Sequence, residues 1–311
     1  MPSNHSDALS SLLTIHLTLP ITWQGESNCG DESYGCSQKA MVTEWRKQWT
    51  PVNAGNNNTD WPFGFVELAG YHRTEWNEPQ VVSQLRRQQQ LASTLDKTFF
   101  AIAMDLSDPA VVADLKTGPG GEVHSRFKEQ VGLRLSLAGR AVAFGESDLE
   151  WRGPTAESAA LCEPGGKTVC VKFKHVGDGG LLDFSGHFPG VGPLFALGYS
   201  DGSWRNATSS LSKKSTKADT IVIAALTPSQ EYVDIQGQGG VALTAVRYAQ
   251  FNEPCDPSND HPGMSPGGGG EHGEPPTLGN MSANLTCALY SRGSISGVLL
   301  PARSFWLNVS L

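Results

Sequence analysis

The sequence has no run of about 18 apolar residues, the length that a membrane-spanning helix needs, so no membrane span is expected. It also has no run of lysine and arginine: 23 basic residues stand against 31 acidic ones, and the formal net charge is -8. This balance argues against a nucleic-acid partner. Neither an internal repeat nor a Cys-x-x-Cys pair occurs, which argues against repeat architectures and zinc ribbons.

Apolar residues, by contrast, are plentiful enough for a folded core. They make up 39% of the 311 residues, and a chain of this length fits one large domain or two ordinary ones. The sequence is therefore that of a globular protein.

The cysteines and the glycosylation sequons point to one kind of compartment. The six cysteines pair by proximity along the chain as Cys29 with Cys36, Cys162 with Cys170, and Cys255 with Cys287. Asn-x-Ser/Thr sequons occur at Asn4, Asn57, Asn206, Asn280, Asn284 and Asn308. Together they favour an oxidising, glycosylating environment, so we expect a secretory-pathway protein, extracellular or lysosomal.

The N-terminal segment is a poor secretion signal. Residues 8–22 are apolar but interrupted by His16, no basic segment precedes them, and they run directly into the loop TWQGESNCG at 22–30. We therefore expect a strand that leads into this loop, and no clear signal peptide.

Strand and helix patterns alternate along the first half. Apolar residues recur with helical spacing in three segments, and continuous apolar runs typical of buried strands lie between them. The expected helices are 39–49, 79–94 and the segment from Phe127 to Ala138, and the expected strands are 63–68 and 98–106. This order indicates a parallel α/β sheet with flanking helices, which we assign to a first domain, residues 1–148.

The pattern changes after residue 148. Short segments with alternating apolar residues follow, separated by Gly-rich and Asp-Gly turns, and they are typical of a β-sandwich. The clearest are 168–174, 220–226 and 240–250. We therefore expect a β-sandwich-like second domain, residues 149–311.

A Pro/Gly-rich insertion at 256–284 interrupts this second domain, and we expect it to be a flexible excursion. It contains His261, Glu271 and His272, but an ordered metal site needs a rigid surrounding shell, so no metal is expected there.

Several segments together resemble the sialate O-acetylesterases, a branch of the SGNH-type esterases. The specific ones are WQGESNC at 23–29 and GGEVHSRFKEQVGLRLSLAGRAVAFGE at 120–146. Weaker ones are VKFKHVGDGG at 171–180 and LTAVRYAQFNEPC at 243–255. The resemblance covers most of the chain from about residue 17 and implies a partial SGNH-hydrolase-like sheet followed by the family's β-domain.

In this family the nucleophile is a serine in an earlier Gly-Gln-Ser-Asn block, and no such block occurs in the sequence. The resemblance therefore implies the C-terminal portion of the fold, with Ser27 a neighbour of the site and not the attacking group. The residues that it assigns to the oxyanion and substrate region are Gln24, Gly25, Glu26 and Asn28. A glycine lets a backbone N–H approach the substrate, and an asparagine amide can donate to a developing oxyanion. Without the surrounding matches, the loop reads as a tight turn pinned through Cys29.

His124 is the expected general base, because a neutral imidazole can take a serine proton and return it to the leaving alcohol. Many relatives carry an Asp three positions earlier, where this chain has Gly121. The orienting acceptor is then a backbone carbonyl near Gly121 or Glu122, or a more distant carboxylate, Asp105 or Asp108. The alternative for His124 is an exposed loop histidine at a helix start.

Two other patterns in the sequence are alternative candidates for a functional site. Residues 198–202, GYSDG, fit the nucleophile elbow Gly-x-Ser-x-Gly, but no helical pattern follows, and a β-turn explains them better. Trp23, Trp61 and Trp76 can stack on sugar faces, although single tryptophans more often pack in a core or rim.

The sequence thus predicts a carbohydrate O-acetylesterase that uses serine-type hydrolysis and no cofactor, with an O-acetylated sugar such as sialic acid as substrate. As an isolated chain without the serine block it is expected to be inactive and poorly soluble. The alternatives are a non-catalytic glycan-binding or scaffold protein derived from the esterase fold, and a longer true protein that carries the serine block.

Overall fold

The computed structural model describes most of the helices and strands of the chain. The described residues are 19–49, 61–70, 81–107, 124, 127–178, 180–183, 195–211, 219–225, 242–250, 289–292 and 299–310. Within them, no helix is long and apolar enough to cross a membrane.

The first part of the chain is built on a parallel sheet in the spatial order β1-β2-β3. Its strands are β1 (Ile21–Thr22), β2 (Phe63–Glu67) and β3 (Thr98–Ile102). Every residue of β2 and β3 is buried, as expected for a parallel sheet whose two faces are both covered.

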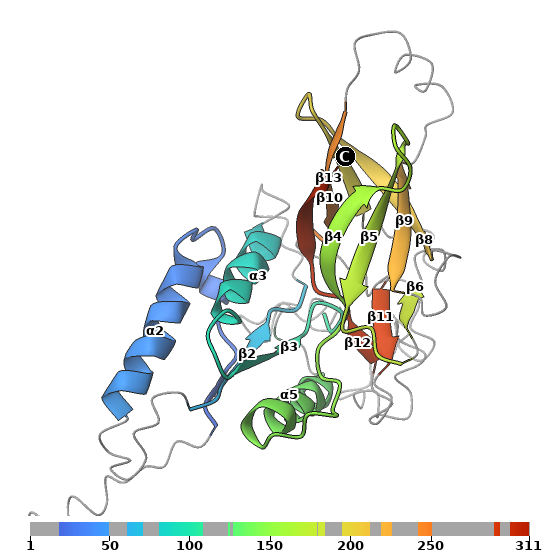
Figure 1. The fold of residues 1–311 in the computed structure, drawn as a ribbon. Helices are drawn as coiled ribbons and strands as arrows, with labels where there is room; N and C mark the ends of the chain where they lie inside the picture. Colours follow the sequence, from blue (N-terminus) through green and yellow to red (C-terminus); the bar gives the residue numbers. More distant parts are fainter. Residues whose placement is uncertain are drawn as a thin grey trace, which may run out of the picture.

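Three helices provide that cover: α2 (Tyr34–Trp49), α3 (Val81–Ala92) and α5 (Lys128–Ala143). Figure 1 shows α2 and α3 together on one side of β2 and β3, and α5 on the other side. Val66, Ala101 and Val131 share the core cluster under α5, whereas Leu68, Val82 and Leu85 share one with Tyr34 under α2 and α3. The predicted α/β pattern of this half is confirmed.

The second part is mainly a closed barrel with the strand order β10-β13-β4-β5-β9-β8-β7. Its strands in chain order are β4 (Thr155–Leu161), β5 (Thr168–Lys174), β7 (Phe195–Tyr199), β8 (Trp204–Leu211), β9 (Thr220–Ala225), β10 (Leu243–Tyr248) and β13 (Phe305–Ser310). A separate small sheet contains β6 (Leu181–Asp183), β11 (Leu289–Arg292) and β12 (Leu299–Pro301).

The barrel differs from the expected sandwich. Alternation along a strand predicts one buried face, and β5 has it: Val169, Val171 and Phe173 are all buried. Alternation does not say whether the outer strands find partners. Here β7 pairs with β10 and β13 pairs in parallel with β4, and these contacts close the ring.

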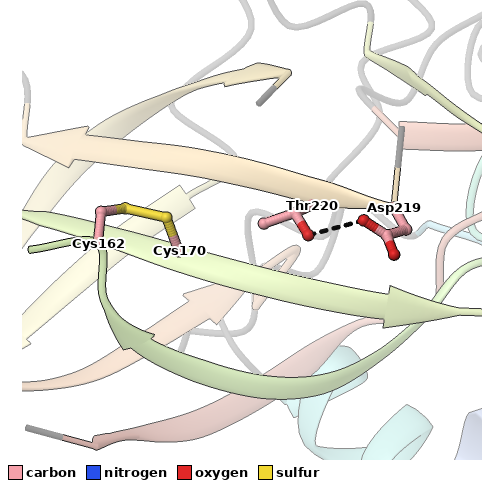
Figure 2. Close-up of a disulfide and its surroundings, with 4 residues drawn as sticks. All are labelled: Cys162, Cys170, Asp219 and Thr220. Atoms are coloured by element: carbon pink, nitrogen blue, oxygen red, sulfur yellow. Dashed lines mark hydrogen bonds between the residues drawn. A yellow bond between two sulfur atoms is a disulfide. The ribbon is translucent and has the colours of Figure 1, made fainter. Parts of the chain in front are cut away.

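Cys162 and Cys170 form a disulfide across the β4–β5 hairpin, which confirms one of the three predicted pairs. Figure 2 shows the bond beside the strand that begins after Asp219, where the Thr220 hydroxyl donates to the Asp219 carboxylate at 2.8 Å. Cys255, Cys287 and the insertion 256–284 lie outside the described residues.

The two parts share one apolar core and a polar clamp. Phe65 and Phe100 of the sheet belong to the same core cluster as Phe173 and Tyr248 of the barrel. Arg303, on the turn before β13, pairs with the carboxylate that ends β2, Glu67, which is 1% exposed. Its guanidinium carbon also lies 4.0 Å from the centre of the Phe100 ring, and one of its N–H groups donates to the Ser93 hydroxyl at 3.1 Å.

Candidate functional site

The three parallel strands end at one edge of the sheet, and the sequence-predicted residues follow two of those ends. β1 runs into the loop 23–30, β2 into Leu68, and β3 into the segment 103–107. In open parallel sheets the carboxyl edge is where ligands bind, because loops from neighbouring strands meet there.

Gly25 adopts a backbone conformation that only glycine tolerates well, with φ at 132°. A Cβ added there would lie 3.1 Å from the Leu85 Cδ2 atom and 3.2 Å from the Tyr34 hydroxyl oxygen. The short 3₁₀ helix η1 (Glu26–Asn28) follows, and the Asn28 N–H donates to the Gly25 carbonyl at 2.8 Å. The loop is therefore a tight turn that the surrounding packing fixes.

A relay of three polar side chains orients Asn28. The Tyr34 hydroxyl donates to Gln24 Oε1 at 2.7 Å, and Gln24 Nε2 donates to Asn28 Oδ1 at 2.9 Å. Because the first bond fixes which end of the Gln24 amide carries the oxygen, the second fixes the Asn28 amide as well. The Asn28 Nδ2 group is thereby left as the donor end of the amide.

Asp31 lies within reach of that donor. The Ser33 hydroxyl and the Ser33 backbone N–H lower the pKa of the Asp31 carboxyl most, and the Asn28 side chain makes a smaller contribution. An Nδ2 group carries two N–H bonds, so Asn28 can serve Asp31 and still donate to a ligand oxygen.

Gln89 is a site residue that sequence reasoning missed. It lies on α3, is 1% exposed, and its Nε2 group donates to the Gln24 carbonyl at 3.0 Å and to the Val66 carbonyl at 3.1 Å. Its Oε1 atom accepts from the Leu68 N–H at 3.0 Å. One buried amide thus joins the β1 loop to the end of β2. The signal for it in the sequence is weak: a glutamine on the face of the helix that also carries Val82, Leu85 and Ala92.

Cys29 and Cys36 are both free thiols, so the predicted Cys29–Cys36 disulfide is wrong. Cys36 lies exposed on the first turn of α2, whereas Cys29 is half-buried against the Tyr34 and Leu85 cluster. Burial raises the pKa of the Cys29 thiol to about 11, against an opposing effect of Arg86. A thiol that stays protonated is a poor nucleophile, so Cys29 is not a candidate attacking group.

The start of α5 lies against the same loop. Lys128 Nζ is 3.5 Å from the centre of the Trp23 ring, and this burial lowers the pKa of the lysine while nearby Glu26 raises it. His124, four residues before Lys128, is exposed. The structure thus places the first turn of α5 against the loop that contains Asn28, and the approach of His124 to this loop stays a prediction.

A buried ion pair fixes α5 at this edge. Both Asp105 oxygens accept from the Arg134 guanidinium, at 2.6 and 2.7 Å, and Arg134 also donates to the Ile102 carbonyl at 2.6 Å. Asp105 therefore holds α5 to the end of β3, and its proposed role beside His124 stays a prediction. Gly121, Glu122 and Asp108 lie outside the described residues.

Two buried polar atoms at this edge find no hydrogen-bond partner among the described residues. They are Trp23 Nε1, after β1, and Ser107 Oγ, after β3, and Ser107 is 3% exposed. An unpaired buried donor is costly, and a polar ligand or water in the edge would relieve that cost. No cluster of possible metal ligands occurs in the described part of the chain.

The rival motif is a hairpin turn, as predicted. Residues 198–202 join β7 to β8, Gly202 has φ at 82°, and the Asp201 carboxylate accepts from the Ser203 N–H at 2.9 Å. Trp61 is buried in the core, and Trp76 lies outside the described residues. Of the predicted glycosylation sites, Asn206 and Asn308 are exposed on barrel strands, and Asn57, Asn280 and Asn284 lie outside the described residues.

Comparisons with known proteins find relatives of the chain. The chain is 30% identical to sialate O-acetylesterase from Homo sapiens over 176 residues, which cover 51% of the chain and 31% of that protein. It is 31% identical to the Rattus norvegicus sialate O-acetylesterase, with 51% of the chain and 30% of the relative covered. The match thus spans about a third of the length of these curated relatives. No family model matches the chain.

A solved structure has the same fold. A carbohydrate acetylesterase from Xanthomonas citri superposes with a TM-score of 0.59 at 21% identity, and the alignment covers 92% of the chain and 49% of that structure. The arrangement of a parallel sheet followed by a barrel is therefore shared along nearly the whole chain.

Proposed function

The chain is related to the sialate O-acetylesterases, and on this premise we propose that it supplies the oxyanion-binding loop and the general base of an esterase that removes acetyl groups from sugars. The named relatives support the reaction and the substrate class: an ester hydrolysis on an O-acetylated sugar such as sialic acid. The assignment of the site residues is argued from the contacts within this chain.

One observation carries the proposal: the first turn of α5 packs on the loop 23–30, through the contact of Lys128 with Trp23. Gln89 and Tyr34 fix the other side of this loop by hydrogen bonds to Gln24. A hydrolase needs the oxyanion donor and the base to approach one reacting carbonyl from different loops, and His124, four residues before Lys128 in the sequence, is the base that we propose for the second of them.

In the proposed mechanism, the Asn28 Nδ2 group and a backbone N–H near Gly25 donate to the oxygen of the tetrahedral intermediate. His124 accepts the proton of the attacking hydroxyl and returns it to the sugar oxygen as the bond between that oxygen and the acetyl carbon breaks; the sugar leaves, and water then releases acetate from the nucleophile with His124 again as the base. The nucleophile is not assigned within 22–30, since Ser27 is exposed on η1, beside the orienting relay and not within it.

A binding experiment tests the site without depending on turnover. We expect an O-acetylated sialic acid to shift the NMR signals of Asn28 and His124, and its de-O-acetylated counterpart to shift them much less. Asn28→Ala should weaken binding by up to about tenfold, the effect of losing one hydrogen bond to the acetyl carbonyl oxygen of the bound sugar. Equal binding of the two sugars, or full binding by Asn28→Ala, would contradict the proposal.

An acetyl-release assay then separates the remaining readings. Activity that Ser27→Ala abolishes would make Ser27 the nucleophile and overturn the loop assignment. Activity lost in His124→Ala but kept in Ser27→Ala would support the base and place the nucleophile elsewhere. Binding of the sugar without release, unchanged in His124→Ala, would favour the alternative of a non-catalytic glycan-binding protein.

The compartment is part of the same proposal. The Cys162–Cys170 disulfide and the exposed sequon residues Asn206 and Asn308 are compatible with an oxidising, glycosylating environment, extracellular or lysosomal. Peptide mapping of non-reduced protein from a secretory host should recover the Cys162–Cys170 link, and finding both cysteines as free thiols would contradict this location.

A further inference from the structure

Two tryptophans and two arginines, from three strands of the barrel and from α3, form a continuous cluster of ring contacts. Trp204 of β8 and Trp306 of β13 meet edge to face, with ring centres 5.0 Å apart. The guanidinium carbon of Arg247, on β10, lies 4.2 Å from the Trp204 ring centre, and that of Arg87, on α3, lies 5.4 Å from the Trp306 ring centre. We call these four residues the Trp–Arg surface.

Strand alternation explains why the surface faces outward. On β10 and β13 the neighbouring residues Val246, Tyr248 and Phe305 enter the core, so Arg247 and Trp306, which are cross-strand partners, lie on the outer face. The middle of this face is made of small residues. A Cβ added to Gly198 would lie 3.0 Å from the Trp204 ring, so the indole lies directly on the β7 backbone.

The two arginines of this surface lack an acidic partner in the part of the chain that the structure describes. Within the described residues neither Arg87 nor Arg247 makes an ion pair with a carboxylate, in a chain whose net charge is -8. Partial burial lowers the pKa of both guanidinium groups, and Arg87 further lowers the pKa of Arg247, which shows that the two cations are close enough to repel. An anion bound between them would relieve this repulsion.

Stacking on an indole leaves the edge of a guanidinium available. A guanidinium carries its N–H donors in its plane, so a face packed on a ring still presents a two-pronged donor to a carboxylate. Trp306 is 45% exposed, so part of its apolar surface is accessible to a ligand beside those donors.

We propose that the Trp–Arg surface is a second, non-catalytic binding site for an acidic sugar, whose carboxylate pairs with Arg247 and Arg87 and whose ring packs on Trp306. Charge complementarity selects the anion, and the open indole selects a flat, partly apolar ring over a simple inorganic ion. The site does not depend on the proposed esterase activity, but it would hold an acidic glycan on an enzyme that acts on one.

Another occupant competes for the same face. Asn206 and Asn308 each follow a tryptophan of the surface by two positions, so each sequon residue lies on the outer face beside an indole. N-linked sugars attached there would cover the tryptophans. The experiment therefore begins with unglycosylated full-length chain and adds glycosylated chain as a separate arm.

Binding is measured by isothermal titration and by saturation-transfer NMR with sialyllactose, which has a carboxylate, and lactose, which does not. We expect sialyllactose to bind and lactose to bind at least about tenfold more weakly, and added salt to weaken sialyllactose binding. Arg247→Gln and Trp306→Leu should each weaken it about tenfold, and Arg87→Lys, which keeps the charge but loses the planar two-pronged donor, should weaken it by a smaller factor. Arg140→Gln, which removes an exposed arginine paired with Glu146, is the matched charge control and should bind normally.

The His124→Ala variant separates this site from the proposed esterase site, because it should bind sialyllactose as the wild type does. Unfolding midpoints of all variants establish that lost binding is not lost folding. The proposal is overturned if lactose binds equally well, if Arg247→Gln and Trp306→Leu bind normally, or if His124→Ala alone removes binding. It is also overturned if chain from a secretory host carries glycans on Asn206 or Asn308 and no longer binds.

Discussion

Lys128 Nζ lies 3.5 Å from the centre of the Trp23 ring, and this contact joins the loop after β1 to the first turn of α5. Asn28 is five residues beyond Trp23, and His124 is four residues before Lys128. Among the described residues, this cation–π contact therefore links the loop that contains Asn28 to the helix that His124 precedes in the sequence.

A double-mutant cycle on Lys128 and Trp23 measures that contact. We expect Lys128→Met and Trp23→Leu to lower the free energy of unfolding by less together than the sum of their separate effects, with a coupling of about 0.5–1 kcal/mol. Lys128→Arg keeps a cation over the ring and should retain most of the stability. Strictly additive losses in urea unfolding would mean that the contact contributes nothing.

Tyr34→Phe removes the hydroxyl that orients Gln24 and, through it, Asn28. We expect a loss of about 1 kcal/mol in unfolding free energy and a clear shift of the Asn28 side-chain amide signals in a ¹⁵N-labelled sample. Thr43→Val is the control, because the Thr43 hydroxyl donates to the Lys39 carbonyl within α2, away from the loop 23–30. Unchanged Asn28 signals in Tyr34→Phe would show that the relay does not orient the amide.

Arg303→Met leaves the Glu67 carboxylate buried without its cation. Breaking a buried pair from one side costs about 3–5 kcal/mol, because the remaining charge stays desolvated. The double variant Arg303→Met, Glu67→Leu should recover part of that loss, since no charge is then buried. We expect both effects in chemical unfolding curves, and a wild-type curve for Arg303→Met would show that the clamp does not hold the two parts together.

The sequence predicts the elements of the fold better than their connections. The apolar runs at 63–68 and 98–106 correspond to β2 and β3 because a strand buried on both faces has a purely local signature. Closure of the barrel has none, since it depends on β13, at the chain's end, pairing with β4, which begins at Thr155. Gly153 shows the same limit: a Cβ there would lie 1.8 Å from the Pro301 carbonyl oxygen, a contact between distant segments.

The residues of the candidate site also differ in how far the sequence predicts them. Gly25 and Asn28 stand out in the sequence because a resemblance to a known family covers their short motif. Gln89 and Tyr34 do not, because their roles arise from hydrogen bonds to Gln24. Gln89 is far from that residue in the sequence, and Tyr34 lies outside the short motif. The predicted disulfide between Cys29 and Cys36 rested on their spacing alone and is wrong, because α2 begins between them and Cys36 is exposed on its first turn.

Cys29 gives the protein an alkaline pH dependence. Its pKa is raised from 9.0 to about 11 in the folded chain, so the folded state holds the thiol proton at pH values where the unfolded state has lost it. The stabilising contribution is therefore complete below about pH 9 and is lost as pH rises through about 11.

We expect the urea midpoint of the wild type to fall more between about pH 8 and about pH 11 than that of Cys29→Ala. Cys36→Ala is the matched control, because that side chain is exposed, and it should follow the wild type. A Cys29→Ala variant with the same pH profile as the wild type would show that burial of this thiol has no effect on stability.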